Sequence, residues 1–203
     1  MKRTGWIILG GVVLLVVIFV AKAFGWYNRL VSLDEEVKSQ WGNVENVYQR
    51  RSDLVPNLVA TVKGAAGFEQ QTLTGVVEAR AKATSMQIDA DALTPENMAR
   101  FEQVQGQLSS ALSRLMVTVE RYPELKATQA FRDLSAQLEG TENRIANERR
   151  KFNDVAKTYN TFRRRFPQSI IASMSGFEAC GYFKAQEGAD QAPKVDFSNP
   201  TNA

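Results

Sequence analysis

The sequence predicts an all-α protein in which one N-terminal transmembrane helix precedes an antiparallel bundle of four long amphipathic helices. Three observations support this prediction: an uncharged apolar run near the N-terminus, apolar residues that recur at helical spacing through the remaining chain, and proline-containing boundaries between segments. We expect residues 1–26 to form the membrane anchor, residues 27–167 the bundle, and residues 168–203 a C-terminal extension.

The apolar run has the length of a membrane span. Residues 5–21 carry no charge, and Trp6 and Trp26 lie twenty residues apart, which is about 30 Å of helix and matches the hydrocarbon core of a bilayer. Both indoles are then expected at the membrane interfaces. Lys22, one turn inside that boundary, can extend its ammonium group to the lipid headgroups.

A cleaved signal peptide is the alternative for the same segment. Lys2 and Arg3 form a short basic region, and Ala21-Lys22-Ala23 resembles a cleavage site. The apolar run is longer than is usual for such a peptide, and helical periodicity resumes directly after Trp26, so we favour an anchor. Basic residues flank both ends of the span, and we place the N-terminus in the cytoplasm and the bundle outside it.

The composition excludes several classes of enzyme. The 203 residues include no histidine and one cysteine, Cys180, so common zinc sites, histidine triads and cysteine–histidine dyads cannot be built. We therefore expect no metal and no cofactor. Setting Lys2 and Arg3 aside from the 25 basic residues leaves 23 against 22 acidic ones, and a domain so balanced is not expected to bind nucleic acid.

The first bundle helix follows the anchor directly. Its face carries two interleaved heptad rows, Tyr27, Asp34, Trp41, Tyr48, Val55 and Leu30, Val37, Val44, Arg51, Leu58. Pro56 removes a backbone donor, so we expect a kink or break near residues 53–56, with Asp53 as a cap. A second helix is expected to run from there to about Ala83, with Gly64 and Gly67 as points of interruption.

Two further helices are predicted after an aperiodic stretch at residues 85–93. Thr94-Pro95-Glu96 is a helix start, with a cap, a first-position proline and a first-turn acid. Tyr122-Pro123 is the expected end of this third helix, and Pro167 ends the fourth. The third helix carries Met98, Phe101, Leu108, Leu112, Leu115 and Val119, with Gln105 as an exception. The fourth carries Leu138, Ile145, Phe152, Tyr159, Phe166 and Leu134, Thr141, Glu148, Val155, Phe162.

The C-terminal extension has a weaker pattern. From residue 186 onward Gly, Pro, Asn and Asp dominate, and a mobile tail is expected. Residues 194–197 have two interpretations: a frayed end, or a short extended segment that docks on a neighbour.

Several segments together resemble the LemA family of proteins. They are Tyr27-Asn28-Arg29-Leu30-Val31, Trp41, Arg50-Arg51-Ser52-Asp53-Leu54-Val55-Pro56-Asn57-Leu58-Val59, Thr61-Val62-Lys63-Gly64, Glu78-Ala79-Arg80, residues 120–127, and Tyr159-Asn160, ending around Phe166-Pro167. The resemblance implies a bacterial single-pass protein of the cytoplasmic (inner) membrane, with a helical bundle and without established enzymatic activity or catalytic residues to carry over. LemA-like proteins are associated with magnetosome membranes or with membrane metalloproteases and other integral membrane proteins, which implies scaffolding.

Two charged residues interrupt the apolar rows. Antiparallel pairing of the first and fourth helices brings Arg51 towards Glu148, with Glu142 or Asp53 nearby, and we expect a partly buried ion pair that fixes the register. A ligand or effector site and simple solvent exposure are the alternatives. Asp53 and Asn57 around Pro56 are interpreted as an internal cap and bend, or as a kink whose free backbone groups bind a partner.

The sequence leaves three functional hypotheses. The leading one is a non-enzymatic membrane scaffold that binds itself or other envelope proteins. The second is a lipid-organising or membrane-remodelling protein, in which Arg163, Arg164 and Arg165 contact anionic headgroups. The third, an enzyme that uses only carboxylates, requires a pocket that a slender bundle seldom provides.

Overall fold

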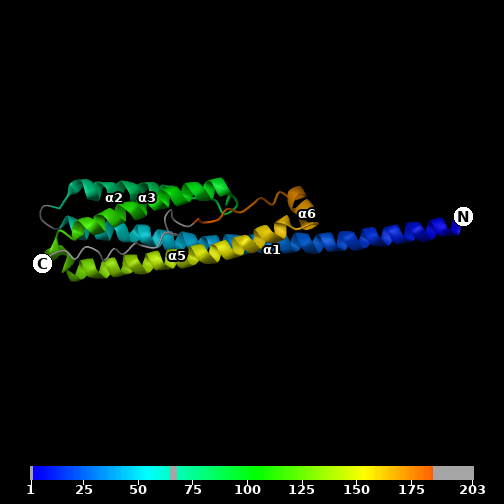
Figure 1. Ribbon diagram of the computed structural model, residues 1–203, viewed down its shortest axis with the longest axis horizontal. Coiled ribbons are helices and arrows are strands. Elements are labelled where there is room, and N and C mark those ends of the chain that lie inside the picture. The colour runs from blue at the N-terminus through cyan, green and yellow to red at the C-terminus, as the bar shows by residue number, and fades with distance from the viewer. Residues whose placement is uncertain (1, 65–67, 185–203) are drawn as a thin grey trace, which may run out of the picture.

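The computed structural model describes residues 2–64 and 68–184, with side chains from Trp6 onward. The predicted all-α class and helical bundle are confirmed: within these ranges the regular elements are all helices. They are α1 (Lys2–Lys63), α2 (Gln70–Ser85), α3 (Pro95–Val119), α4 (Pro123–Lys126), α5 (Gln129–Arg164) and α6 (Gln168–Met174). Figure 1 shows an elongated molecule in which α1 projects far beyond the other helices at its N-terminal end. The expected mobile tail and the extended segment at 194–197 lie outside the described residues.

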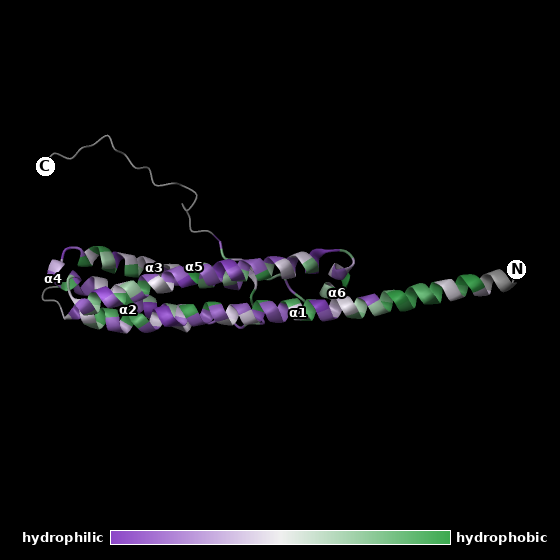
Figure 2. Ribbon diagram, turned by 90° about the horizontal axis from the view of Figure 1, so that it is seen from below, coloured by the Kyte–Doolittle hydropathy of each residue, from purple (hydrophilic) through white to green (hydrophobic). Residues whose placement is uncertain are grey.

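The bundle consists of α2, α3, α5 and the C-terminal part of α1, with successive long helices antiparallel (Figures 1 and 2). Two cross-links fix the direction of α5 against α1. Gln40 bonds to Glu148, and Arg51, further along α1, bonds to Glu142, which lies earlier in α5. The short α6 packs on α1 and α5 at the end of the bundle from which α1 projects.

The projecting part of α1 is apolar and uncovered. Its most apolar 18-residue window has a mean hydropathy of 2.8, and none of it is buried. Among the described residues, α1 is the one helix long and apolar enough to cross a membrane, and Figure 2 shows this apolar stretch continuing without a break into the amphipathic part of the helix. The bundle core begins at Leu30, which is completely buried.

The predicted helix break at Pro56 is wrong, because α1 continues through it to Lys63. A proline at position 56 leaves the carbonyl of Ser52 without its usual helical donor. Arg80 of α2 replaces that donor: its Nε donates to the Ser52 oxygen at 2.8 Å. The helix therefore keeps its backbone satisfied with a proline in its interior.

The residues beside Pro56 do not act as an internal cap. Asp53 is exposed and accepts a hydrogen bond from Gln49, and the Asn57 carbonyl accepts one from Thr61, both within one helical turn. The interruption lies later, where α1 ends immediately before Gly64. Gly67 lies outside the described residues.

The other boundaries follow their local signals. The Thr94 hydroxyl accepts from the Asn97 amide at 3.3 Å, so the predicted start of α3 is confirmed. α3 ends at Val119, just before the predicted boundary at Tyr122-Pro123, and Pro123 opens the single-turn α4. Thr128 then caps α5 through the Phe131 amide.

The core is divided along the bundle axis into two hydrophobic clusters. The cluster nearer the projecting helix is rich in aromatic rings, with Trp41 contacting Phe101, Phe152 and Phe183 at centroid distances of 5.1, 5.7 and 6.2 Å. The distal cluster is aliphatic, and its larger members include Val55, Leu58, Val62, Leu73, Leu108, Leu112 and Leu115. Arg51 lies in the sequence of α1 between these clusters and belongs to neither.

Candidate functional site

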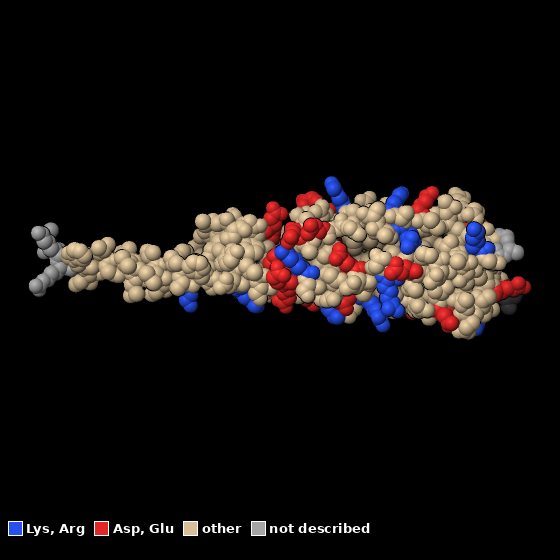
Figure 3. All heavy atoms as spheres, turned by 180° about the vertical axis from the view of Figure 1, so that it is seen from behind, with Lys and Arg blue, Asp and Glu red and all other residues tan. Residues whose placement is uncertain are grey.

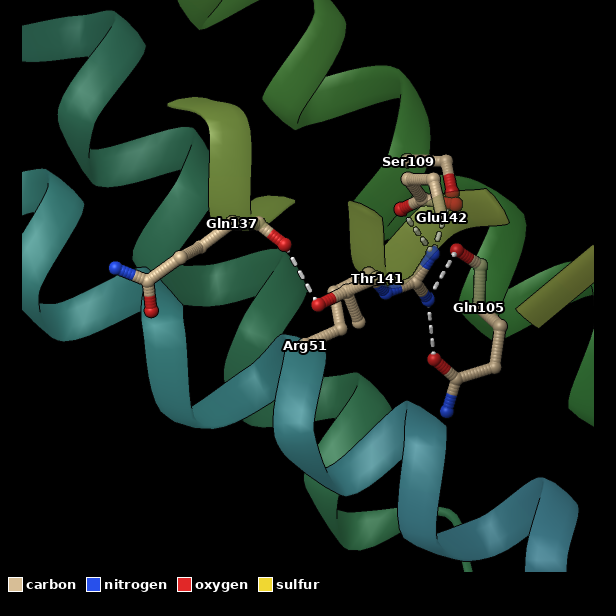
Figure 4. Close-up of polar contacts among 6 residues, drawn as sticks. All are labelled: Arg51, Gln105, Ser109, Gln137, Thr141 and Glu142. Atoms are coloured by element: carbon tan, nitrogen blue, oxygen red, sulfur yellow. Dashed lines mark hydrogen bonds and ion pairs between the residues drawn. The ribbon is translucent and has the colours of Figure 1, made fainter. Parts of the chain in front are cut away.

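Arg51 is the centre of a polar layer that joins the four bundle helices. Its side chain is only 1% exposed. One terminal nitrogen donates to the Ser109 hydroxyl at 2.7 Å and to Glu142 at 2.9 Å, and the other donates to the backbone and side-chain oxygens of Gln105 at 3.3 and 2.6 Å (Figure 4). The Gln105 amide in turn donates to the Ala83 carbonyl of α2.

This layer can fix the relative positions of the helices, because each of its hydrogen bonds forms only when α1 has one particular register against its neighbour. A guanidinium presents its donors in a fixed planar fork, and here the fork is matched from α3 and α5 at once, while the guanidinium carbon lies 5.0 Å from the centre of the Tyr48 ring. Gln105, the exception in the predicted apolar stripe of α3, is 5% exposed and bonds within this layer. The two terminal nitrogens of the buried guanidinium are therefore hydrogen-bonded and paired, while its Nε has no hydrogen-bond partner among the described residues.

The predicted pairing of Arg51 with Glu148 is wrong. The register of α5 places Gln40 beside Glu148, which accepts from Gln40 Nε2 at 2.7 Å and from Lys151 Nζ at 2.8 Å. These hydrogen bonds, that from Lys151 first, lower the pKa of Glu148. Arg51 bonds instead to Glu142, which was expected only to lie nearby and is six residues earlier on α5.

A second arrangement binds the backbone of the extended segment at residues 177–184. Asn160 donates to the Cys180 carbonyl at 2.8 Å and accepts from the Cys180 amide at 3.1 Å. Asn153 repeats this pattern with the carbonyl and amide of Phe183, at 2.8 and 2.9 Å. The two asparagines lie seven residues apart on α5, which puts them on one face of the helix.

Other side chains extend the same pattern in both directions. Tyr159 donates to the Glu178 carbonyl and Arg163 to the Phe177 carbonyl. At the far end Arg149 donates to the Lys184 carbonyl, and Glu102 of α3 accepts from the Lys184 amide. We call this set of six side chains the C-terminal clamp: Glu102, Arg149, Asn153, Tyr159, Asn160 and Arg163.

Gly181 allows the clamped segment to lie against α3. Its amide donates to the Leu93 carbonyl at 2.8 Å, and a Cβ atom at this position would lie 2.8 Å from Met98 Cγ and 3.0 Å from Pro95 Cα. Tyr159 and Asn160 belong to the predicted motif residues, but the clamp itself was not predicted from the sequence. Its signals are the heptad spacing of Asn153 and Asn160 and the glycine among aromatic and small residues at positions 177–183.

The residues predicted at the membrane surface lie along and just beyond the uncovered part of α1. Trp6 and Lys22 are exposed, and Trp26 is half-buried with its ring 6.1 Å from that of Phe19. Tyr27 contacts Phe177 at a ring distance of 5.9 Å, and Asn28 is exposed.

The arginines that end α5 lie at the same end of the bundle. Arg164 and Arg165 are exposed, and Arg165 lines a surface cleft together with Arg29 of α1. Arg163, which belongs to the clamp, is half-buried.

A cleft of about 490 Å³ lies between α1, the loop that precedes α3, and the clamped segment. Three of its charged groups are paired with one another: Lys38 lies 2.8 Å from Asp34 and 2.5 Å from Asp91, and these hydrogen bonds raise the pKa of Lys38. Burial raises the pKa of the Cys180 thiol to about 12, the opposite of what a nucleophile needs. Among the described residues there is also no group of three or more Cys, Asp or Glu side chains placed to hold a metal ion.

Known proteins with similar sequences include magnetosome proteins and a LemA protein. Magnetosome protein MamQ 2 from Paramagnetospirillum magneticum is 28% identical over 200 aligned residues, which cover 88% of this chain and 72% of the relative. Magnetosome protein MamQ from Magnetospirillum gryphiswaldense is 27% identical, with the same coverage. Protein LemA from Metamycoplasma hominis is 23% identical over 175 residues, covering 86% of this chain and 76% of the relative.

The family model for the LemA family matches residues 40–197, so it includes the polar layer and the whole clamp and extends past Pro167. With a match over more than half of its length, the chain belongs to the LemA family.

Proposed function

We propose that this protein is a non-enzymatic scaffold of the bacterial inner membrane that holds a rigid bundle beside the bilayer for assembly with other membrane proteins or with copies of itself. The observation that carries the proposal is the continuity of α1. One helix is apolar and uncovered over its first part and supplies core residues from Leu30 onward, so no flexible joint separates the span from the bundle. At 62 residues it is about 93 Å long.

Two further observations support a non-enzymatic role. The groups that most resemble catalytic candidates, Lys38 and Cys180, are engaged in ion pairs or held as a neutral thiol. The buried polar groups of the Arg51 layer bond to one another across helices, as expected of a device that fixes structure. The likeness to proteins named magnetosome proteins supports a role in organising a membrane-associated assembly.

Tethering raises the effective concentration of weak partners, so crosslinking in native membranes tests the proposal. A photoreactive residue at Val117, an apolar position on α3 that is 71% exposed, should crosslink to an envelope protein or to a second copy, and mass spectrometry identifies which. A matched probe at Arg50, exposed on α1, tests a second face of the bundle. Absence of protein adducts from both positions contradicts the scaffold.

Orientation needs its own experiment. We infer a cytoplasmic N-terminus with the bundle outside the cytoplasm, supported by the basic Lys2 and Arg3. Proteinase K added to spheroplasts should then degrade the bundle, with a cytoplasmic marker protein as the control. Protection of the bundle until the membrane is lysed contradicts this orientation.

The second candidate is a lipid-organising or membrane-remodelling protein, favoured by the exposed Arg164 and Arg165 at the end of the bundle nearest the apolar part of α1. Full-length protein reconstituted into vesicles would then change their shape or diameter in proportion to its density, as seen by electron microscopy. Unchanged vesicles, together with a heterologous crosslink, favour the scaffold alone.

A further inference from the structure

We infer that α6, together with Phe166 just before it, lies in the headgroup region of an anionic bilayer beside the span. We call this short element the interfacial foot. The inference rests on the proposed membrane anchorage and adds a second, distinct contact with lipid. We define the foot by its three outward apolar residues, Phe166, Ile170 and Met174.

The first argument is exposure. Phe166 is 82% exposed, Met174 84% and Ile170 48%. Ile170 and Met174 lie four residues apart on α6, which is the spacing of one helix face, and Phe166 lies just before the helix. The opposite side of α6 holds the element in place, because Ala172 is only 1% exposed. An apolar face that remains uncovered on a folded surface marks a site of interaction with protein or membrane.

The second argument is height along the molecule. Phe177, three residues after α6, packs against Tyr27, which is the next residue after the expected interface residue Trp26. Figure 1 shows α6 at the end of the bundle where α1 continues alone. A residue of helix advances about 1.5 Å, so Phe177 lies near the level of Trp26, where the headgroup region begins, and α6 packs on α1 beside it.

The third argument is charge. Residues 166–177 contain no charged side chain, and on the face seen in Figure 3 the end of the bundle that adjoins the apolar rod shows no acidic residue until a band begins further along. Basic residues flank the same level: Lys22 and Arg29 on α1, and Arg164 and Arg165 at the end of α5. An apolar surface flanked by arginines suits the boundary between acyl chains and anionic phosphates.

A partner protein is the alternative occupant, and accessibility measurements on the full chain distinguish it from lipid. A spin label is placed at Met174→Cys in a Cys180→Ala background, in vesicles of phosphatidylcholine with phosphatidylglycerol. Collisions with lipid-soluble oxygen should exceed those with a water-soluble nickel chelate. Val117→Cys is the matched control, since it is equally apolar and well exposed on α3, and there the chelate should dominate.

The outcomes separate this inference from the anchorage on which it rests. A third label at Val13→Cys reports the span itself. If position 13 is in lipid but position 174 collides with the chelate like position 117, the foot is overturned and the anchor stands. Shielding of position 174 from both reagents means that protein covers this face, which also overturns the foot. A water-accessible position 13 overturns the anchorage and the foot together.

The arginines provide a second readout. Native mass spectrometry of the full chain released from the same bilayers should show fewer retained phosphatidylglycerol molecules for Arg164→Gln with Arg165→Gln than for the unmodified protein, with affinity falling about fivefold for each arginine. Arg100→Gln with Arg114→Gln, exposed positions on α3, is the control for charge alone. Equal retention in both variants overturns the assignment of anionic lipid to this end of the bundle.

Discussion

At the scale of single residues, two arginines connect the bundle helices in different ways. Arg51 brings a charge into the interior, where it is tolerated only because Glu142, Gln105 and Ser109 accept its hydrogen bonds. Arg80 instead replaces a missing backbone hydrogen bond, since it donates to the Ser52 carbonyl that Pro56 leaves without a donor. Both side chains act between helices, so their loss should be felt as lost stability of the whole bundle.

Replacing Arg51 by alanine should lower the free energy of unfolding by about 3 kcal/mol, because the buried Gln105 loses its charged donor and the large, buried arginine side chain leaves a cavity. The measurement is denaturant unfolding of the full chain in detergent micelles, followed by circular dichroism. Arg50→Ala, at the exposed neighbouring position, should change stability by less than about 0.5 kcal/mol. Equal midpoints for the two variants contradict a structural role for the layer.

We expect substitutions of Pro56 and Arg80 to have non-additive effects on the free energy of unfolding. Arg80→Ala should cost about 1–3 kcal/mol, since the Ser52 carbonyl is buried and would be left unsatisfied. Pro56→Ala restores the backbone donor and should stabilise the helix by about 1–3 kcal/mol, and in that background Arg80→Ala should cost less. Additive effects in this double-mutant cycle would show that Arg80 does not compensate for the proline; Lys82→Ala, exposed on the same helix, is the control.

At the scale of elements, the clamp turns one face of α5 into a binding surface for an extended chain. Asn153 and Asn160 each satisfy a carbonyl and an amide of the segment, as a neighbouring β-strand would. Because the bonds go to the backbone, the segment is held with little regard to its side chains, apart from Gly181 and the apolar anchors Cys180 and Phe183.

Removing the clamp should free the segment without unfolding the bundle. Asn153→Ala with Asn160→Ala should increase hydrogen exchange at the Cys180 and Phe183 amides to near the rate of an open chain, while amides at the centre of α5 stay protected. Mass spectrometry of the exchanging protein measures this, and Asn147→Ala, exposed on α5, is the control. Unchanged exchange at residues 177–184 would mean that packing alone holds the segment.

Cys180 gives the clamped segment a pH dependence. Burial raises its pKa from 9.0 to about 12, so between these values the unfolded chain has lost a proton that the folded chain retains, and stability falls as pH rises. Urea unfolding between pH 8 and pH 11 should show this decline, and Cys180→Ala should reduce its slope. Tyr159, whose pKa burial raises to about 12, contributes in the same direction above pH 10. An unchanged slope in the alanine variant excludes the thiol as a source.

At the scale of the whole molecule, much of the architecture could be predicted because its signals are local. Thr94-Pro95-Glu96 marks a helix start, and the apolar spacing of α3 and α5 marks their buried faces. The choice of Glu142 over Glu148 as the partner of Arg51 could not be predicted, because a shift of a turn or two between two long helices leaves each apolar stripe unchanged.

Two other features also lay beyond local patterns. Continuity through Pro56 depends on Arg80, which lies in another helix. The clamp escaped prediction because side chains that bind backbone impose no periodic pattern on the segment they hold.

If the projecting part of α1 spans the bilayer, acidic substitutions should impair membrane insertion only in that part of the chain. Val13→Asp with Val17→Asp should cost about 5 kcal/mol of insertion free energy and move the protein from the carbonate-resistant membrane fraction to the soluble one. Val77→Asp with Val117→Asp, exposed apolar positions within the bundle, should remain in the membrane. Carbonate-resistant protein in both cases would contradict the assignment of this segment as the anchor.

The unbroken run of α1 from the apolar part into the bundle also sets the azimuth of the molecule. One residue added between Trp26 and Leu30 would rotate the bundle by about 100° around the axis of α1. Seven added residues would return the bundle almost to its original orientation and move it about 10 Å further from the membrane. The number of residues between Trp26 and Leu30 therefore sets the direction in which the bundle faces its neighbours. An insertion of one residue mainly rotates the bundle, whereas an insertion of seven mainly changes its distance from the membrane.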